Sequence, residues 1–194
     1  MTTDAYTVPP HVTLGPTLET ERLILRPPAV EDFPRWAAFM ADPETARFIG
    51  GVQPAPQVWR LICTVAGMWA LTGEGMFSIL EKETGQWIGR IGPLHPYGWP
   101  GREVGWSLHR DATGKGYAVE AAAATMDYAF EVLGWHDVIH CIAPENLPSA
   151  AVATRLGSRN RGPGALPEPL QDIAIDLWGQ TRDEWAINRT PLKR

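Results

Sequence analysis

Hydrophobic positions in the first part of the chain follow the spacing of one strand and then of helices. Residues 22–26 form a short apolar run closed by two prolines, which predicts a strand. Residues 32–40 carry apolar side chains at helical spacing, with Asp32 as the expected cap, and residues 56–72 predict a longer helix that ends before two glycines. The apolar face of the longer helix comprises Val58, Ile62, Val65, Met68 and Trp69.

The middle of the chain changes to the pattern of strands. Residues 76–83 and 86–91 are two strand-like runs separated by Thr84-Gly85, which predicts a hairpin. A loop rich in Pro, Gly and Trp follows, and residues 103–109 predict a third strand. The remaining elements are expected to be a helix over 117–133, a strand over 137–143, a helix over 146–156, a loop over 158–171, a strand over 173–178 and a capping box at 181–184. This order indicates a mixed α/β layout around one sheet.

Composition narrows the class of protein. A chain of 194 residues favours one domain, and a formal charge of -5 argues against a protein that binds duplex nucleic acid. The first twenty residues contain no apolar run of the secretory kind, and residues 61–71 are too short to span a bilayer. We therefore expect a cytoplasmic protein with no nucleic-acid or membrane partner.

A glycine turn lies between the predicted strand 103–109 and the helix that follows. Gly114 and Gly116 would expose successive backbone N–H groups at a helix N-terminus, which is an arrangement that binds phosphates. A P-loop would require glycine at His109 and Ser or Thr at Gly116, and a dinucleotide fingerprint would require Gly or Ala at Val119. Both nucleotide motifs are absent, which leaves another phosphate ligand or a plain tight turn.

The segment around this turn resembles a known family. Residues 109–121, HRDATGKGYAVEA, are similar to the acetyl-CoA-binding segment of the GNAT N-acetyltransferases, in particular to the "GKGYATEA" of the RimJ/RimL-like branch. Residues 20–26 resemble that branch's "TERLxLR", residues 103–108 its "EIGYWL", and residues 143–149 its "xxxENxxS". Four motifs in the same order cover about residues 17–187.

The resemblance implies an α/β (α+β) GNAT fold: a mixed, mostly antiparallel central sheet with splayed parallel strands, flanked by helices. It places the splayed strands at 103–109 and 137–143, with acetyl-CoA in the cleft between them and no metal. Residues 1–16 would be an N-terminal extension and residues 17–194 a single acetyltransferase domain. Monomer and homodimer both remain open.

The resemblance also assigns the cofactor site. The pyrophosphate would lie on the amides of residues 112–117, and a backbone N–H of the strand 103–108 would meet the oxyanion, with Gly105 consistent with a bulge. The implied cofactor-binding residues are Leu108, His109, Ala112, Thr113, Gly114, Lys115, Gly116, Tyr117, Ala118, Asn146 and Ser149.

Three residues take catalytic roles in this reading, each with a structural alternative. Glu103 would deprotonate the amine through water, or be a surface carboxylate near the sheet edge. Asn146 would order the thioester or cap a helix, and Ser149 would protonate the leaving thiolate or lie in a capped first turn. His95 and His109 are secondary catalytic candidates. His136 and His140 have metal-ligand spacing, but in a strand and with no third ligand nearby.

The implied reaction is transfer of an acetyl group from acetyl-CoA to a primary amine, on a small molecule or a peptide N-terminus, by direct attack on the thioester. A catalytically inactive acyl-CoA-binding regulatory module is the alternative, and an interaction protein with a Trp-lined face is a third. Two departures from the branch pattern are Thr113, where a bulky residue is usual, and Ser158, where the branch has Phe.

Overall fold

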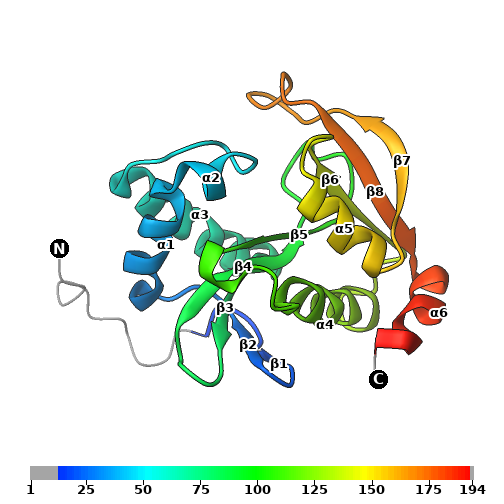
Figure 1. The fold of residues 1–194 in the computed structure, drawn as a ribbon, viewed down its shortest axis with the longest axis horizontal. Coiled ribbons are helices and arrows are strands. Elements are labelled where there is room, and N and C mark those ends of the chain that lie inside the picture. The colour runs from blue at the N-terminus through cyan, green and yellow to red at the C-terminus, as the bar shows by residue number, and fades with distance from the viewer. Residues whose placement is uncertain (1–12, 193–194) are drawn as a thin grey trace. The chain divides into compact units, whose positions relative to one another are not determined.

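The computed structural model describes residues 13–192, in which eight strands and six α-helices form (Figure 1). Residues 1–12 of the expected N-terminal extension lie outside the described residues. The elements in chain order are β1 (Leu18–Glu19), β2 (Leu23–Arg26), the 3-10 turn η2 (Val30–Asp32), α1 (Phe33–Ala41), α2 (Pro43–Ala46), α3 (Ala55–Thr72), β3 (Phe77–Glu81), β4 (Trp87–Leu94), β5 (Glu103–Leu108), the 3-10 turn η3 (Arg110–Ala112), α4 (Tyr117–Glu131), β6 (Asp137–Ile142), α5 (Leu147–Arg155), β7 (Arg159–Gly164), β8 (Ile175–Thr181) and α6 (Arg182–Leu192).

The strands form one sheet in the order β1-β2-β3-β4-β5-β6-β8-β7. β5 and β6 run parallel, whereas β2 with β3, β3 with β4, and β6 with β8 run antiparallel. The parallel register is the single pair Glu103↔Ile139, while β6 and β8 are paired from Asp137↔Thr181 to Ile142↔Asp176. The expected mixed, mostly antiparallel GNAT sheet is confirmed, and its two parallel strands pair over one position.

The chain divides into two compact units, which are described separately. The first contains the chain up to Ile91 together with Ser107–Lys115, and its core lies where helices cover β4. Trp36 and Phe39 of α1 each lie 5.4 Å from Trp87 of β4, between ring centroids. The apolar face predicted for α3 is buried at Val58, Ile62, Val65 and Trp69, and Met68 is half-buried.

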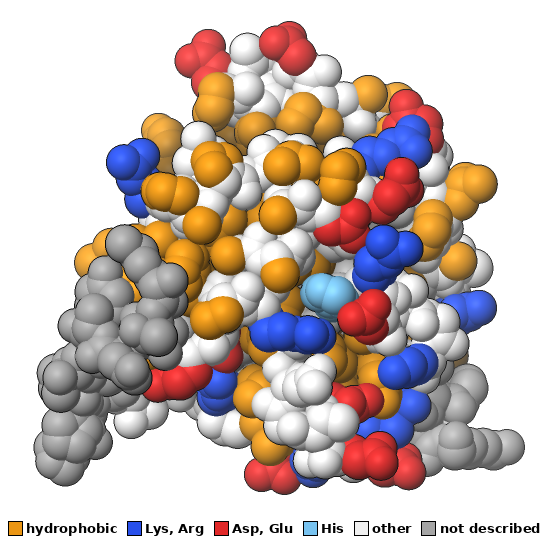
Figure 2. All heavy atoms as spheres, turned by 60° about the vertical axis from the view of Figure 1, so that its left-hand side comes forward, with side chains coloured by type: hydrophobic (Ala, Val, Ile, Leu, Met, Phe, Trp, Pro, Cys, Tyr) orange, Lys and Arg blue, Asp and Glu red, His pale blue; other side chains and the backbone are white. Residues whose placement is uncertain are grey.

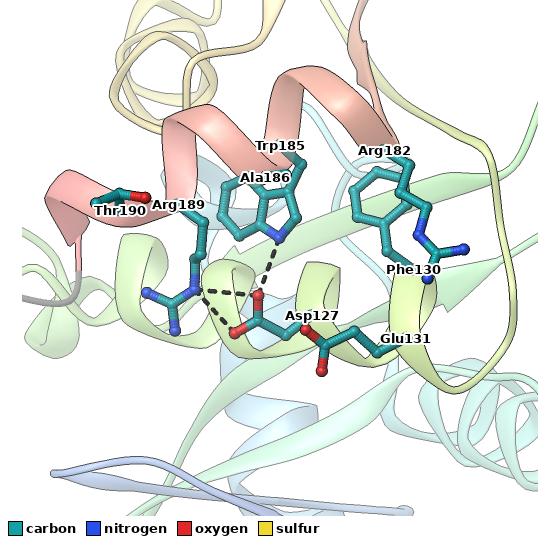
Figure 3. A pocket seen from close by; sticks show the side chains of 8 residues that line it. All are labelled: Asp127, Phe130, Glu131, Arg182, Trp185, Ala186, Arg189 and Thr190. Atoms are coloured by element: carbon teal, nitrogen blue, oxygen red, sulfur yellow. Dashed lines mark hydrogen bonds and ion pairs between the residues drawn. The ribbon is translucent and has the colours of Figure 1, made fainter.

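The second unit contains Gly92–Trp106 and the chain from Gly116 onward. Asp127 of α4 accepts hydrogen bonds from Trp185 Nε1 (2.9 Å) and Arg189 Nε (2.8 and 3.0 Å), both on α6 (Figure 3). A pocket of about 280 Å³ lies beside these contacts. None of the predicted site residues lines it, and Asp127, one of its two carboxylates, already has partners, so these contacts attach α6 to α4. The capping box predicted at Thr181 is confirmed by reciprocal bonds with Glu184.

Two local expectations are wrong. Asp32 does not cap α1 with its side chain: the carboxylate is buried, pairs with Arg26 at 2.7 and 2.9 Å and accepts from Ser78 Oγ at 2.6 Å. A charged bidentate partner is a stronger competitor than a helix amide. Residues 158–171 are not all loop, because Arg159–Gly164 forms the edge strand β7 on β8, with a register shift before Pro163. Proline has no N–H to donate to a regular ladder, so a register shift in an edge strand is one of the places where a sheet tolerates it.

Within residues 13–192, no helix has the combination of length and apolar character that crossing a membrane requires.

Candidate active site

β5 and β6 separate immediately after their one paired position. The N–H of Ile139 donates to the carbonyl of Arg102 at 2.9 Å, as in a parallel ladder. The next bond of such a ladder would join the N–H of Cys141 to the carbonyl of Val104. Instead the Cys141 N–H donates to Glu103 Oε1 at 3.1 Å, and the Val104 carbonyl accepts from a histidine ring of β6. Polar side chains therefore satisfy the backbone groups that the divergence leaves unpaired.

Glu103 is one of these side chains, and it is 6% exposed. Its second oxygen accepts from Trp99 Nε1 at 2.6 Å, and its pKa is raised above the ordinary value because burial disfavours the charged form more than these donors favour it. Gly105 leaves the room that this carboxyl occupies, since a β-carbon there would lie 3.2 Å from Glu103 Oε1. The alternative of a surface carboxylate is wrong for Glu103.

His140 is the second side chain in the divergence, and it is 1% exposed. Its Nδ1 lies 2.7 Å from the Val104 carbonyl and its Nε2 lies 2.9 Å from Ser158 Oγ. A carbonyl can only accept, so Nδ1 carries the hydrogen and Nε2 accepts from the Ser158 hydroxyl. The pKa of His140 is lowered to about 4, chiefly by burial and also by the nearby Arg161, whereas the Val104 bond and Asp137 oppose the shift.

The Ser158 hydroxyl continues into a buried amide network. Gln180 Nε2 donates to Ser158 Oγ and to the Leu156 carbonyl, each at 2.9 Å, and Asn188 Nδ2 donates to Gln180 Oε1 at 2.9 Å. When His140 is neutral, each hydrogen bond from Val104 through His140, Ser158 and Gln180 to Asn188 has one donor and one acceptor. Sequence reasoning missed the network, although Ser158 in place of the branch's Phe was its one visible signal.

The glycine turn lies on the surface between η3 and α4. Gly114 and Gly116 have φ of +77° and +82°, which is the left-handed region that glycine adopts without strain. The N–H groups of Ala112 and Thr113 donate within η3, to the carbonyls of His109 (2.9 Å) and Arg110 (3.2 Å). These two amides are therefore engaged, and a phosphate cradle would rest on the amides that follow them.

The turn is also tied, within the first unit, to the residue that precedes β2. Arg22 Nη1 donates to the carbonyl of Lys115 at 2.9 Å. Arg22 belongs to the segment 20–26 that carries one of the four family motifs, so this bond connects two of those motifs. Leu108 ends β5 and is half-buried, Tyr117 is the buried first residue of α4, and half-buried Ala118 follows it.

The first turn of α5 carries the other two catalytic candidates. Asn146 Oδ1 accepts from the N–H of Ser149 at 3.3 Å, which is an N-cap and confirms the structural alternative for both residues. The cap uses the Asn146 oxygen and the Ser149 backbone, so the Asn146 amide nitrogen and the Ser149 hydroxyl keep their own bonding capacity. Of the secondary candidates, His95 is exposed and His109 Nδ1 lies 3.3 Å from Asp111 Oδ2.

Two other possibilities raised by the sequence can be compared with the structure. In residues 13–192 no group of three His, Cys, Asp or Glu side chains could hold a metal ion. Of the nine tryptophans, five are buried and four are half-buried, and none is fully exposed. Figure 2 shows scattered hydrophobic groups on the side it presents, and the exposed large hydrophobic residues come from separate segments, such as Leu71, Tyr97 and Ile187.

Comparisons with known proteins agree with this geometry. The family model described as acetyltransferase (GNAT) domain matches residues 22–159. The uncharacterized N-acetyltransferase p20 of Bacillus licheniformis is 33% identical over 166 residues, which are 84% of this chain and 93% of that protein.

Solved structures give the same result. The acetyltransferase from Agrobacterium tumefaciens str. C58 is 38% identical, with a TM-score of 0.76, over 86% of this chain and 95% of that one. Mycobacterium smegmatis RimJ, solved in complex with CoA-disulfide, shares the fold at 21% identity and a TM-score of 0.68, over 89% of this chain and 90% of that one. GNAT members use acyl-CoA. Since the family model spans well over half of its residues, the chain belongs to the GNAT family of N-acetyltransferases.

Proposed function

We propose that this GNAT enzyme transfers an acetyl group from acetyl-CoA to a primary amine, on a small molecule or a peptide N-terminus, by direct attack of the amine on the thioester. The observation that carries the proposal is the divergence of β5 and β6 after Glu103↔Ile139. Side chains of the two strands form the hydrogen bonds of the Val104 carbonyl and the Cys141 N–H there. This supports a separation of the strands that belongs to the stable fold.

The glycine turn supports the phosphate-binding part of the proposal. Gly114, Lys115 and Gly116 are exposed, and the two glycines carry no β-carbon that would block the approach of an anion to the backbone. The first turn of α4 adds N–H groups that have no acceptor within their own helix, together with the positive end of the helix dipole. In this proposal the amides from Gly114 to Ala118 hold the CoA pyrophosphate.

The chemistry at the thioester is assigned to three side chains. Glu103 takes the proton from the ammonium or amine through a water molecule, and its raised pKa makes it a better base than an ordinary carboxylate. The amide nitrogen of Asn146 donates to the pantetheine arm, and the Ser149 hydroxyl gives a proton to the departing thiolate. The half-buried Cys141 thiol has a pKa raised mainly by desolvation, which disfavours a thiolate nucleophile and fits direct attack.

A screen of primary amines and peptides with acetyl-CoA, read by release of free thiol, tests the proposal. We expect thiol release that depends on the amine, and a higher melting temperature in the presence of CoA. A melting shift with CoA but no turnover on any amine would indicate the regulatory module instead. No shift and no turnover would overturn both CoA-dependent readings.

A further inference from the structure

Arg90 on β4 is a buried arginine for which the described residues provide no counter-ion. The residue is 9% exposed, and it lies over the ring of Trp36 on α1, whose centroid is 5.7 Å from the guanidinium carbon. Within residues 13–192 it has no hydrogen bond and no ion pair. Arg26 in the same unit differs, because it is held by a bidentate pair with Asp32.

Trp36 shares this deficit. Among the residues that the structure describes, the buried side-chain nitrogens and oxygens without a partner are two, Trp36 Nε1 and Arg90 Nε. Both atoms are N–H donors, and they belong to side chains in contact with each other. Buried polar groups are normally satisfied, and an unpaired buried charge is expensive to retain. Two donors without an acceptor, on side chains that contact each other, indicate a place for a ligand that brings acceptor atoms.

We propose that Arg90 and Trp36 bind a carboxylate of the amine acceptor, so that the acceptor is an amine that also bears a carboxyl group. This inference rests on the acetyl-transfer function proposed above. The Nε–H of an arginine and one of its Nη–H groups form a fork that matches the two oxygens of a carboxylate. One guanidinium and one indole supply enough N–H donors for a singly charged carboxylate, but too few for the three acceptor oxygens and double charge of a phosphate dianion.

Arg90 follows a residue of β4 that contacts the end of β5 within the first unit. Gly89, the preceding residue, lies so close to β5 that a β-carbon there would meet the Ser107 carbonyl oxygen and the Leu108 backbone. Leu108 is one of the residues that the family resemblance assigns to the cofactor site, and it belongs to the same unit as Arg90. Burial lowers the pKa of Arg90 to about 10, so the group remains a cation at neutral pH. Arg90 therefore lies next to a residue that packs directly on Ser107 and Leu108, and it keeps its charge.

The anion site is tested first without any turnover. Melting temperatures of the wild type, Arg90→Gln and the control Arg60→Gln, an exposed arginine of α3, are measured in sodium acetate and in sodium chloride of equal ionic strength. We expect acetate to raise the melting temperature of the wild type and of Arg60→Gln above the chloride value, and not that of Arg90→Gln. Equal acetate effects in all three proteins would overturn the site.

The acceptor assignment is tested with matched pairs of substrates, each an amino acid and its carboxamide. We expect the wild type and Arg60→Gln to have a KM for the acid that is about tenfold or more below that for the amide, and Arg90→Gln to lose this preference. Equal use of acid and amide by the wild type would overturn the assignment. If no amine is acetylated while acetate still discriminates wild type from Arg90→Gln, the acetyl-transfer function and the acceptor assignment fail, and the carboxylate site stands.

A third measurement distinguishes a ligand-binding arginine from one held by the fold. Arg90→Met removes an unpaired buried charge and keeps an unbranched side chain over Trp36, so we expect an unchanged or higher melting temperature in chloride. A clear decrease relative to Arg60→Met would show that Arg90 already has a structural partner, and would overturn the proposal.

Discussion

Nδ1 of His140 lies 2.7 Å from the carbonyl oxygen of Val104, across the point where β5 and β6 separate. This bond places the hydrogen on Nδ1 and leaves Nε2 to accept from Ser158. A neutral imidazole thus takes the place of a backbone N–H in the parallel ladder. The divergence that we assign to acetyl transfer depends on a side chain that is buried and uncharged.

Stability should therefore decrease in mild acid. The unfolded chain protonates His140 near its ordinary pKa of 6.5, whereas the folded protein resists protonation down to about 4. Between these values the unfolded state binds more protons, so the contribution of His140 is full above pH 6.5 and is lost as the pH falls towards 4, by about 3 kcal/mol in total. Urea unfolding at a series of pH values measures this change.

The control for this experiment must separate His140 from other groups. Glu103 acts in the opposite direction, because its raised pKa gives a contribution that is present at low pH and is lost as the pH rises above 4.5. His140→Gln retains an amide donor for Val104 and does not titrate, so its loss of stability in acid should be smaller. Exposed His136→Gln should keep the wild-type profile. Identical profiles for all three proteins would contradict the role of His140.

Ser158→Ala should destabilise the protein by about 1–3 kcal/mol, because it leaves the buried His140 Nε2 without a donor and removes one acceptor from Gln180. A double-mutant cycle with His140→Ala measures the coupling in free energy of unfolding. We expect each substitution to lower the free energy of unfolding by less when the other substitution is already present. Additive losses would show that the two residues stabilise the fold independently.

Gly114→Ala separates backbone strain from phosphate binding when it is compared with Gly85→Ala. Both glycines are exposed and have positive φ (+77° and +68°), and a β-carbon at either would meet no atom within 4 Å. Each substitution should therefore cost about 1–2 kcal/mol in unfolding free energy. Only Gly114→Ala should raise the KM for acetyl-CoA. Equal KM values in the two variants would remove the turn from the cofactor site.

The first turn of α5 allows capping and catalysis to be distinguished. Asn146→Ala should lose about 1 kcal/mol of stability and weaken the use of acetyl-CoA, whereas Asn146→Ser keeps a capping oxygen and should lose only cofactor affinity. Ser149→Ala keeps the N–H that Asn146 binds. Its melting temperature should not change, and its kcat should fall more than its KM for acetyl-CoA rises. Wild-type kinetics in Asn146→Ser and Ser149→Ala would leave both residues with structural roles alone.

Glu103→Gln should remove the acidic limb of the rate profile. As the base, Glu103 must be ionised, so kcat/KM of the wild type should fall as the pH drops through its raised pKa. Gln has one carbonyl oxygen for the two donors Cys141 N–H and Trp99 Nε1–H, so the variant should also be less stable by about 1–3 kcal/mol. The same acidic limb in the variant as in the exposed control Glu131→Gln would assign the base elsewhere.

Local patterns in the sequence were sufficient to predict most of the elements. Gly73 and Gly157 directly follow the helices predicted over residues 56–72 and 146–156, and both adopt positive φ there. β7 could not be predicted in this way, because Arg159–Gly164 has no hydrophobic period and becomes a strand only by pairing with β8. Asp32 is of a residue type that often caps helices, but Arg26, a partner outside its helix, binds its carboxylate more strongly.

The sequence motifs were sufficient to predict which residues belong to the candidate site, but not how buried they are or which partners they contact. The acidic residue at 103 and the Asn-x-x-Ser of α5 were visible, but the burial of Glu103 depends on Trp99 and on Cys141, which is 38 residues away. The partners of His140 lie 36 residues before it and 18 residues after it, so only the fold brings them together. Arg90 had one local signal, a lone charge within an apolar strand between Gly89 and Gly92.

The transfer itself is tested most directly by following both products of one reaction. The protein is incubated with acetyl-CoA and primary amines, including amines with and without a carboxylate, and free thiol and acetylated amine are quantified together, the amine by mass spectrometry. We predict one acetylated amine for each thiol released, at a rate that Gly114→Ala lowers when acetyl-CoA is limiting. Thiol release without acetylated amine, or CoA binding without either product, would contradict the account.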